Sequence, residues 1–393
     1  MSDGSTVALA LAVAAGASYV LSGLATRAAV ATGFIDHPVG YKGHLAPTPY
    51  LGGAAVILSI LAVTLLLTGT GRSLSAVLAC AAALCLVGTV DDRVAVAPRW
   101  RVAAEILAAG ILFSFGVHWS PFDVGVLDFA VSAAWVVGVV NAFNLMDNMD
   151  GANPTVTGVS AASLGVIALS GGQTPLAVAS FAVAGACLGF LPHNLAGPAR
   201  IFLGDGGSMP LGFLVAALSM ASLDADSLAA GADAVLAGGL VAGLPILDTA
   251  LVVVSRRRRG VPFVTGGRDH LTHRLLVRAG SPRRVALLLA LGQSALAALA
   301  VGAFELGTGF GVPVAIAVVA AGIAAVAVLE SPAWRTDRPA EATPAGGQAA
   351  RGAPTTVDAD PMARANIMEP PVRYATCGEH PAAPSASRSS DDR

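Results

Sequence analysis

The chain has 393 residues, of which 55% are hydrophobic and only 12% are charged. A soluble domain of average composition has roughly 25% charged residues, so this balance excludes an ordinary soluble enzyme. The formal net charge of −2 offers no basic surface for a nucleic-acid partner, and the four cysteines have neither the spacing of a disulfide framework nor that of a zinc site. The composition therefore predicts an integral membrane protein.

Apolar runs of membrane length recur from one end of the chain to residue 330. In lipid, every backbone group must be paired within its own element, so these runs are expected to be helices. We predict an all-α polytopic bundle of about ten or eleven transmembrane helices, each of about 20 residues or slightly fewer. The predicted spans are 6–30, 50–68, 74–90, 102–117, 126–146, 155–170, 175–191, 209–222, 232–254, 284–304 and 309–329.

The chain divides into two parts by composition. Residues 1–330 form the predicted polytopic membrane domain. Residues 331–393 are rich in Pro, Ala, Ser, Arg and Asp, and such a segment buries too little apolar surface to fold. We therefore expect a disordered tail, which the predicted topology places in the cytoplasm.

Basic residues gather on alternate loops, which predicts the orientation of the bundle. One set of loops carries Lys42, Arg93, Arg99, Arg101, Arg200, the run from Arg256 to Arg259, Arg268, Arg274, Arg278, Arg283 and Arg284. The opposite loops carry only Arg72, with Asp224, Asp226 and Asp233. By the positive-inside rule the first set is cytoplasmic, so we expect a plasma (inner) membrane protein. The four-arginine run is expected to anchor the topology on anionic lipid.

Carboxylates lie on the same loops as the arginines, and carboxylates at membrane depth are functional candidates. Asp91 and Asp92 close the third predicted span. Adjacent carboxylates repel, and such a pair suits divalent metal binding or proton abstraction. A solvated loop balanced by Arg93 is the alternative interpretation.

A second polar block ends the fifth predicted span. Asn144, Asp147 and Asp150 follow one another at intervals of three, which would place them on one face of a continuing helix. Oxygen ligands on one face can hold Mg²⁺ or the hydroxyls and ring edge of a nucleotide. The alternative is a polar helix cap followed by an Asn/Asp/Gly turn.

A glycine-rich block precedes the eighth predicted span. Three glycines surround Asp205, and glycine allows close backbone approach to a ligand and free N–H groups for phosphate. No Gly-Lys-Ser/Thr follows, so this is not a Walker loop. Phe202 could stack on a base or could pack against a helix.

Two further loops are suited to binding phosphate. Arg268, His270, His273 and Arg274 form a cationic cluster suited to a pyrophosphate, with a zinc-binding histidine pair as the alternative. In the loop after the first span, Lys42 (the single lysine of the chain) and His44 can reach a phosphate, or can anchor the loop at the membrane surface.

Taken in order, these blocks resemble those of the polyprenyl-phosphate N-acetylhexosamine-1-phosphate transferases. The resemblance covers roughly residues 33–280 and the helical pattern beyond. The blocks that carry it are Asp36 with Lys42-x-His44 and Pro-Thr-Pro, Asp91-Asp92, Asn141-x-x-Asn144-x-x-Asp147-x-x-Asp150-Gly, Phe202-x-Gly-Asp205-x-Gly-Ser, and His270-x-x-His273 after Pro245-x-x-Asp248. Each block is weak alone, whereas all five in order on one membrane face are strongly specific.

The resemblance implies a reaction and a role for each residue. A polyprenyl phosphate attacks the β-phosphorus of a UDP-N-acetylhexosamine, UMP leaves, and Mg²⁺ (or Mn²⁺) assists; membrane lipid and a second copy in a homodimer are the implied partners. Asp205, with Asp91, would bind the metal, and Asp91 or Asp92 would position or deprotonate the lipid phosphate. Asn144 and Asp147 would line the phosphate and ribose, Asp150 and Phe202 would hold uracil, and His270, His273 and Arg274 would contact the sugar-diphosphate end.

Three positions depart from the family pattern. Ala95 stands where a third polar residue often follows the carboxylate pair, Asn148 replaces the commoner Gly, and Thr272 replaces a frequent His. Asn148 and Thr272 lie near the expected position of the donor, so they bear on which sugar the donor carries. The likeness is closer to the branch that uses UDP-GlcNAc-type donors than to the muramoyl-pentapeptide branch, whose loop has consecutive histidines.

Three rival functions remain open at the level of sequence. A secondary transporter would place its charges near the bilayer midplane, whereas here they lie at span ends. A CDP-alcohol phosphotransferase would carry one compact aspartate block, which is absent from the sequence. A catalytically inactive relative would bind lipid or nucleotide, although retention of all five candidate aspartates argues against it.

Overall fold

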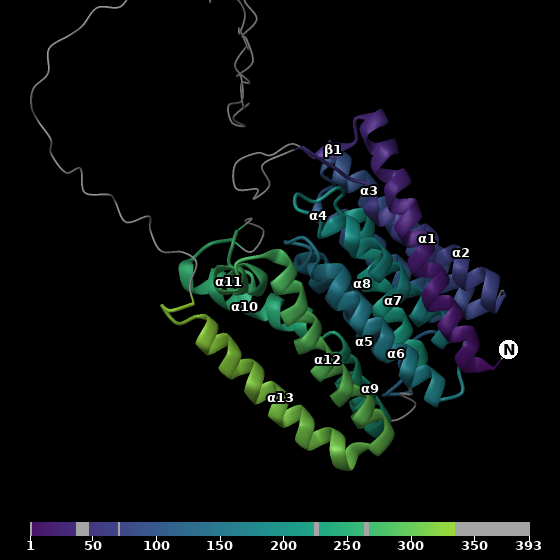
Figure 1. Cartoon of the computed structure of the whole chain (residues 1–393). Coiled ribbons are helices and arrows are strands. Elements are labelled where there is room, and N and C mark those ends of the chain that lie inside the picture. The colour runs from purple at the N-terminus through teal and green to yellow at the C-terminus, as the bar shows by residue number, and fades with distance from the viewer. Residues whose placement is uncertain (1, 37–46, 70, 224–227, 263–266, 335–393) are drawn as a thin grey trace, which may run out of the picture. The chain divides into compact units, whose positions relative to one another are not determined.

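The computed structural model describes residues 2–36, 47–69, 71–223, 228–262 and 267–334 (Figure 1). Within these ranges the chain is almost entirely helical, with one antiparallel pair of two-residue strands. The elements are α1 (Asp3–Thr32), β1 (Ile35–Asp36), β2 (Thr48–Pro49), α2 (Gly52–Thr68), α3 (Arg72–Val94), α4 (Pro98–Ser114), α5 (Gly125–Met146), α6 (Ala152–Ser170), α7 (Thr174–Asn194), α8 (Asp205–Ser222), α9 (Leu228–Val241), α10 (Gly243–Arg259), α11 (Leu271–Ala279), α12 (Pro282–Leu306) and α13 (Thr308–Leu329).

The all-α polytopic fold class is confirmed. Among the described residues, seven helices are long and apolar enough to cross a membrane, namely α1, α3, α5, α6, α7, α12 and α13 from Phe310 on. The pair formed by α9 and α10 passes the same test as a single interrupted span, and α2 is a shorter apolar helix. The remaining predicted spans, 102–117 and 209–222, are the helices α4 and α8. The chain is a multi-pass membrane protein.

One predicted span, 232–254, is not continuous. The chain turns by 79° between Asp233–Val241 and Gly243–Arg259. Pro245 lacks the N–H that would continue the helical ladder to the carbonyl of Val241. That carbonyl instead accepts from the side-chain amide of Gln293 at 2.7 Å and from the hydroxyl of Ser160 at 2.6 Å. The break is stable at membrane depth because neighbouring helices satisfy the freed backbone groups.

Helix α8 is the centre of the bundle, buried along nearly its whole length and packed against α2, α3, α5 and α6. Small residues permit this close packing. A Cβ at Gly88 of α3 would collide with the carbonyl oxygen of Asp205, and one at Gly53 of α2 would collide with the backbone of Gly207. The first turn of α8 therefore lies directly against α2 and against the end of α3 that carries Asp91 and Asp92.

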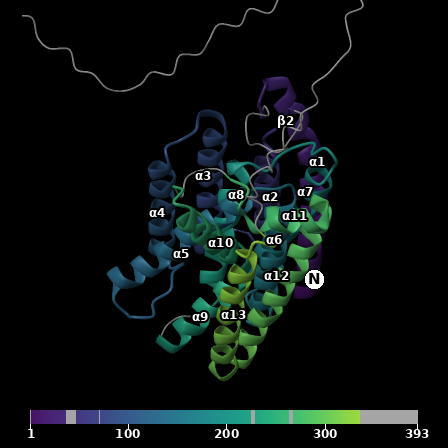
Figure 2. The ribbon, with the colours of Figure 1, turned by 90° about the vertical axis from the view of Figure 1, so that its left-hand side faces the viewer.

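Helix direction alternates, so the polar helix ends meet on one side of the bundle. Hydrogen bonds join the end of α3 to the start of α4, the end of α5 to the start of α8, and the end of α7 to the start of α6. Helix α4 packs against both α3 and α5, and Figure 2 shows α3 and α4 next to each other. The prediction that the polar loops share one face agrees with this arrangement.

Candidate active site

Arg101, in the first turn of α4, lies at the centre of the polar cluster. Its Nη1 donates to Asp91 Oδ2 at 2.7 Å and to Asp205 Oδ2 at 2.9 Å, and its Nη2 donates to Asn144 Oδ1 at 3.1 Å. Sequence reasoning treated Arg101 only as a topology signal. The available clue was that Arg101 lies in the first turn of the helix that follows Asp91. Consecutive antiparallel helices bring the end of one close to the start of the next.

Asn144 joins α5 to α8. Its side-chain amide donates to Asp205 Oδ1 at 2.8 Å and to the hydroxyl of Ser208 at 2.9 Å. Four helices, α3, α4, α5 and α8, thus contribute one side chain each to a single cluster of Asp91, Arg101, Asn144 and Asp205. We call these four residues the carboxylate cluster. Three of its members are residues that the sequence motifs selected.

Asp92 has a different position from its neighbour. Its two carboxylate oxygens accept the backbone N–H groups of Asp205 at 2.9 Å and Gly206 at 3.1 Å. A carboxylate there satisfies the unpaired donors at the start of α8 and interacts favourably with the helix dipole. Gly204, at φ 70°, allows this approach, since a Cβ there would collide with the Asp92 carboxylate. Asp92 therefore holds α8 in place, and Asp91 is the member of the pair that faces Arg101.

Asp147 and Asp150 do not continue the α5 helix as expected. The helix ends at Met146, Asp147 is the residue that caps it, and Gly151 precedes α6 in the left-handed conformation. The cap-and-turn alternative describes this segment. Desolvation, followed by repulsion from Asp205 and Asp92, raises the pKa of Asp147 well above its ordinary value. Asp147 thus borders the carboxylate cluster from the side of the α5–α6 turn.

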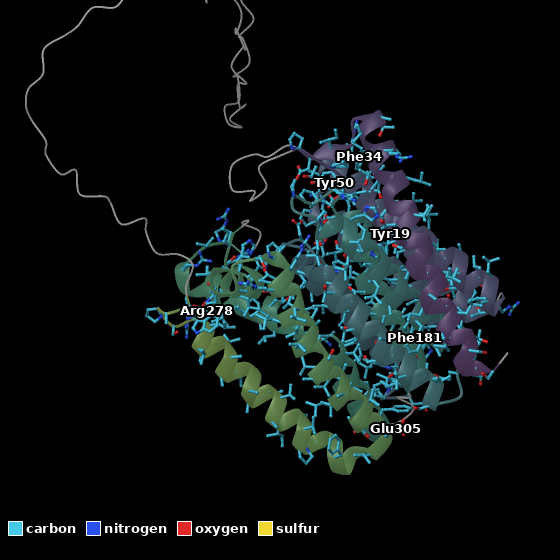
Figure 3. The ribbon with its side chains drawn as sticks, viewed as in Figure 1. Tyr19, Phe34, Tyr50, Phe181, Arg278 and Glu305 are labelled. Carbon is cyan, nitrogen blue, oxygen red and sulfur yellow. The ribbon has the colours of Figure 1, made fainter. Side chains whose placement is uncertain are left out.

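Phe202 packs where the chain enters α2. Its backbone N–H donates to Pro49 at 2.9 Å, and its carbonyl accepts from Gly52 at 3.1 Å. Its ring meets Tyr50 edge-on at 6.1 Å between centroids, and Tyr50 in turn meets Phe34 at 6.0 Å (Figure 3). Burial, then the nearby Asp36 carboxylate, raises the pKa of Tyr50. These contacts give Phe202 the packing environment that was the alternative to stacking on a base.

His270 and His273 lie beside one another as the spacing predicts, although His270 precedes α11 and does not belong to the helix. His270 is the residue before α11 and has extended backbone, and its Nδ1 lies 2.8 Å from Asp248 Oδ2. Asp248 Oδ1 also accepts the N–H of Leu271 at 2.6 Å. The two imidazole rings are 6.0 Å apart. Burial, then the neighbouring charge of His270, lowers the pKa of His273 to about 4, so His273 is neutral near pH 7.

The arginines of this region mainly interact with other groups of the protein. Arg274 is 2% exposed, and its guanidinium donates to Glu330 Oε1 at 2.7 Å and to the carbonyl of Asp269 at 3.1 Å. This placement differs from the expected contact with a sugar diphosphate. Arg268 lies close enough to His273 for its charge to lower the pKa of that imidazole.

The arginine run at the end of α10 also has protein partners. Arg256, 4% exposed, binds Asp269 with two hydrogen bonds of 2.9 and 3.1 Å, and Arg259 binds the same carboxylate at 2.5 Å. Although burial opposes ionisation, Arg256 holds the pKa of Asp269 below its ordinary value. Arg256 was expected to anchor the chain on anionic lipid. It is instead buried, and it supports the segment from Arg268 to His273, which we call the histidine loop.

Two positions that depart from the family pattern contact one another. The Thr272 hydroxyl donates to the side-chain carbonyl of Asn148. The amide of Asn148 in turn donates to the carbonyl of Leu145 at 2.6 Å. This pair joins the α5–α6 turn to α11, and it therefore brings the histidine loop against the segment that carries Asp147 and Asp150.

The residues of the carboxylate cluster fit a magnesium ion. Asp91, Asp205 and the carbonyl oxygen of Asn144 converge on one cation, the Arg101 guanidinium. Mg²⁺ prefers oxygen ligands and is commonly bound through one or two carboxylates plus substrate phosphates. The described residues contain no group of three or more His, Cys, Asp or Glu side chains placed to hold a metal ion, so Asn144 and the substrate phosphates would have to complete the coordination here.

Two predicted substrate-binding residues, Lys42 and His44, lie outside the described residues. Their assignment stays a prediction from sequence.

The sequence also matches known proteins. The family model for glycosyl transferase family 4 matches residues 74–223, which include Asp91, Asn144 and Asp205. The decaprenyl-phosphate N-acetylglucosaminephosphotransferase of Mycobacterium tuberculosis is 34% identical over 308 residues, covering 69% of this chain and 76% of the relative. The undecaprenyl-phosphate alpha-N-acetylglucosaminyl 1-phosphate transferase of Salmonella typhimurium is 29% identical over 279 residues, covering 68% and 75%.

A probable undecaprenyl-phosphate N-acetylglucosaminyl 1-phosphate transferase of Bacillus subtilis is 28% identical over 281 residues, covering 69% of this chain and 77% of the relative. These similarities extend well beyond the motif blocks. The resemblance inferred from the motifs is confirmed: the chain belongs to the polyprenyl-phosphate N-acetylhexosamine-1-phosphate transferases of glycosyl transferase family 4.

Proposed function

We infer that this protein transfers a sugar-1-phosphate to a polyprenyl phosphate, and we propose that the donor is a UDP-N-acetylhexosamine, with UDP-GlcNAc first among candidates. The relatives named above act on polyprenyl phosphates with an N-acetylglucosamine-derived group. The observation that carries the proposal is the carboxylate cluster, in which Asp91, Asn144 and Asp205 converge on Arg101 at the polar helix ends. Such a site can receive an anionic lipid headgroup from the membrane and a nucleotide from solution.

The reaction is a phosphoryl substitution at the β-phosphorus of the donor. One oxygen of the lipid phosphate forms a bond to that phosphorus, and the bond between the phosphorus and the oxygen bridging to the α-phosphate breaks. The bridging oxygen leaves with UMP, and the product is a polyprenyl-diphospho-sugar. The lipid phosphate is largely ionised near neutral pH, so the step needs no strong base.

The main physical difficulty is bringing two anions together. Arg101 places a positive charge between Asp91 and Asp205 and so offsets part of their mutual repulsion, which lets the two carboxyl groups share a site. We propose that Asp205, Asp91 and the Asn144 carbonyl hold Mg²⁺, or Mn²⁺ in its place. The ion, when bound, supplies charge stabilisation on the transferring phosphoryl group. With the metal bound, Arg101 would be available to a substrate phosphate, for which its planar fork is suited.

The face of the membrane and the oligomeric state belong to the proposal as well. Arg93, Arg99 and Arg101 lie at the same helix ends as the carboxylate cluster, whereas Arg72 lies at the opposite end of α3. The positive-inside rule therefore supports a site on the cytoplasmic face of the plasma membrane. A homodimer is the assembly that the family resemblance implies.

A transporter reading is less well supported. The broken helix pair α9–α10 has the form of a discontinuous span. However, the side chains of Gln293 and Ser160 already donate hydrogen bonds to the backbone carbonyl of Val241 at the break. The carboxylate cluster lies at helix ends, where an interfacial enzyme needs its charges.

The test uses purified full-length protein in detergent with undecaprenyl phosphate, Mg²⁺ and a panel of UDP-sugars, and it follows UMP release. We expect UMP from one N-acetylhexosamine donor, dependent on the lipid phosphate and abolished by EDTA. Folded protein that binds UDP-sugar but releases no UMP with any donor would instead indicate a binding protein. Failure to bind any UDP-sugar would reopen the transporter interpretation.

A further inference from the structure

Apart from Gly311, the described part of α13 is buried only at its C-terminal end. From Phe310 to Leu329 the helix is strongly apolar and only 6% of its most apolar stretch is buried within the protein, as expected for a helix that faces lipid. At its end the environment changes abruptly, since Leu329 is 7% exposed and Glu330 is 4% exposed. A peripheral helix thus ends in a buried carboxylate, which a solely lipid-facing role does not require.

The Glu330 carboxylate is bound by Arg274 of α11, the helix that follows His270. Glu330 Oε1 accepts from Arg274 Nη2 at 2.7 Å, and Arg274 Nη1 donates to the carbonyl of Leu329. On the α10 side, Arg258 lies 3.7 Å from the other oxygen of Glu330. The end of α13 therefore bridges α10 and α11.

A second contact lies one turn further along α11. The guanidinium of Arg278 stacks 3.2 Å above the ring of Trp334 and donates to the carbonyl of Ala333 at 3.1 Å. Figure 3 shows Arg278 beside the end of α13, at the opposite end of that helix from Glu305. Residues 329–334 thus contact α11 at two points along its length. We call residues 329–334 the C-terminal latch.

Helix α11 needs such support. It has nine residues, and isolated helices of that length are unstable in water. Its N-terminal end is held by Asp248, which accepts from Leu271 and lies against His270. Its remaining length carries His273, Arg274 and Arg278 in sequence. Because Arg274 is fully buried, its charge requires the Glu330 partner, and a buried charge left alone would be expelled toward water.

We propose that the C-terminal latch positions α11, and with it His273, for the nucleotide-sugar donor, and that Glu330 is the positioning residue. The assignment of α11 to the donor rests on the proposed function. Glu330 does not touch the reacting atoms; it acts through Arg274. The latch also makes the donor side of the site depend on the last helix of the bundle, which is far from the carboxylate cluster in sequence.

The experiment compares full-length variants in one detergent preparation. Glu330→Gln removes the charge with little change of shape, and Glu330→Asp keeps the charge. Trp334→Ala removes the second contact without leaving a buried charge, so it carries the test if Glu330→Gln fails to fold. Glu305→Gln is the matched control, since Glu305 is an exposed glutamate at the end of α12, next to the start of α13 and away from Glu330. Each variant is assayed for hydrogen–deuterium exchange and for the KM values of donor and acceptor.

The latch predicts faster exchange confined to residues 267–279 in Glu330→Gln and Trp334→Ala. It also predicts a raised donor KM and a donor kcat/KM lowered by up to about a hundredfold, the order of loss that a misplacement of about 1 Å can cause. The KM for polyprenyl phosphate and all parameters of Glu305→Gln stay at the wild-type values, and Glu330→Asp recovers most of the donor KM.

Two results would overturn the latch. The first is wild-type exchange and donor KM in both Glu330→Gln and Trp334→Ala. The second is faster exchange throughout α3, α5 and α8 with equal loss toward both substrates, because that pattern describes general destabilisation. Failure of the proposed function gives a different result: wild-type protein would release no UMP with any donor, and donor binding together with exchange in α11 would then decide whether the latch exists.

Discussion

Arg101 shows how one side chain organises the candidate site. Its guanidinium contacts Asp91, Asp205 and Asn144, which come from three different helices. A planar donor fork can satisfy several carboxylate oxygens at fixed angles, which a lysine ammonium cannot do equally well. The geometry of the carboxylate cluster therefore depends on the identity of this cation as well as on its charge.

The first prediction concerns Asp205. Asp205→Asn removes the negative charge expected to bind metal and turns one acceptor into a donor that faces Arg101 or Asn144, both of which already donate. We expect UMP release to fall by about a hundredfold or more, as when one transition-state contact is lost, while the protein, although less stable, stays folded at the assay temperature. Steady-state kinetics and thermal unfolding check this. Normal turnover in a well-folded variant would remove Asp205 from the metal site.

The second prediction separates the two adjacent aspartates. Asp92→Ala leaves the N–H groups of Asp205 and Gly206 without their acceptor, so we expect a loss of roughly 1–2 kcal/mol of stability, typical of a lost helix cap. Asp91→Asn should lower turnover with a smaller effect on unfolding. Thermal melts of the two variants side by side provide the measurement. Equal melting temperatures would contradict the capping role of Asp92.

At the residue scale, the sequence motifs identified which side chains gather but not what each one does. Asp91 and Asp92 are equivalent in a motif, and their roles diverge only because the start of α8 packs against one of them. Arg101 was missed because its partners lie on other helices. Arg274 was assigned to substrate because its buried partner, Glu330, follows it by 56 residues and belongs to no motif.

At the scale of elements, the α10–α11 segment is held by buried ion pairs. Asp269 receives three hydrogen bonds from Arg256 and Arg259, and its pKa lies below its ordinary value. A carboxylate with a depressed pKa stabilises the fold at pH values above its unfolded pKa, and this stability is lost as the pH falls through its folded pKa.

The third prediction follows from the lowered pKa of Asp269, whose ionised form stabilises the fold. Above about pH 5, Arg256→Gln should melt well below wild type, because the ionised Asp269 loses its main partner. The gap should narrow as the pH falls from about 4 through the depressed pKa of Asp269 in the folded protein. Arg257→Gln, at an exposed neighbouring position, is the control. A gap that stays constant from pH 7 down to the lowest pH at which the wild-type protein is folded would show that Asp269 does not carry this stability.

Element boundaries were predicted well where hydrophobic length alone decides them. All eleven predicted spans fall on helices, because lipid leaves the backbone no other choice there. The exception, the break within 232–254, depends on Gln293 and Ser160, which approach from helices distant in sequence. A Gly- and Pro-containing segment indicates where a helix can break, but whether it breaks depends on partners that a local pattern does not contain.

At the scale of the whole molecule, the distribution of charge predicts which face carries the site. The fourth prediction uses a Cys377→Ala background, in which the other cysteines, Cys80, Cys85 and Cys187, are buried. A cysteine at Arg72 should react with a membrane-impermeant maleimide in intact cells. A cysteine at Arg93 should react only in inside-out vesicles. The reverse pattern would place the carboxylate cluster outside the cytoplasm.

The most direct test of the account asks which bond is broken. Full-length protein is incubated with undecaprenyl phosphate and UDP-GlcNAc carrying ³²P at the β-position. The account predicts that the label moves into the lipid fraction together with the sugar, in equal amount with released UMP, because the β-phosphate is transferred with the hexosamine. Label retained in the aqueous phase as UDP, with sugar on the lipid, would mean that the sugar is transferred without its phosphate, and it would contradict the central claim.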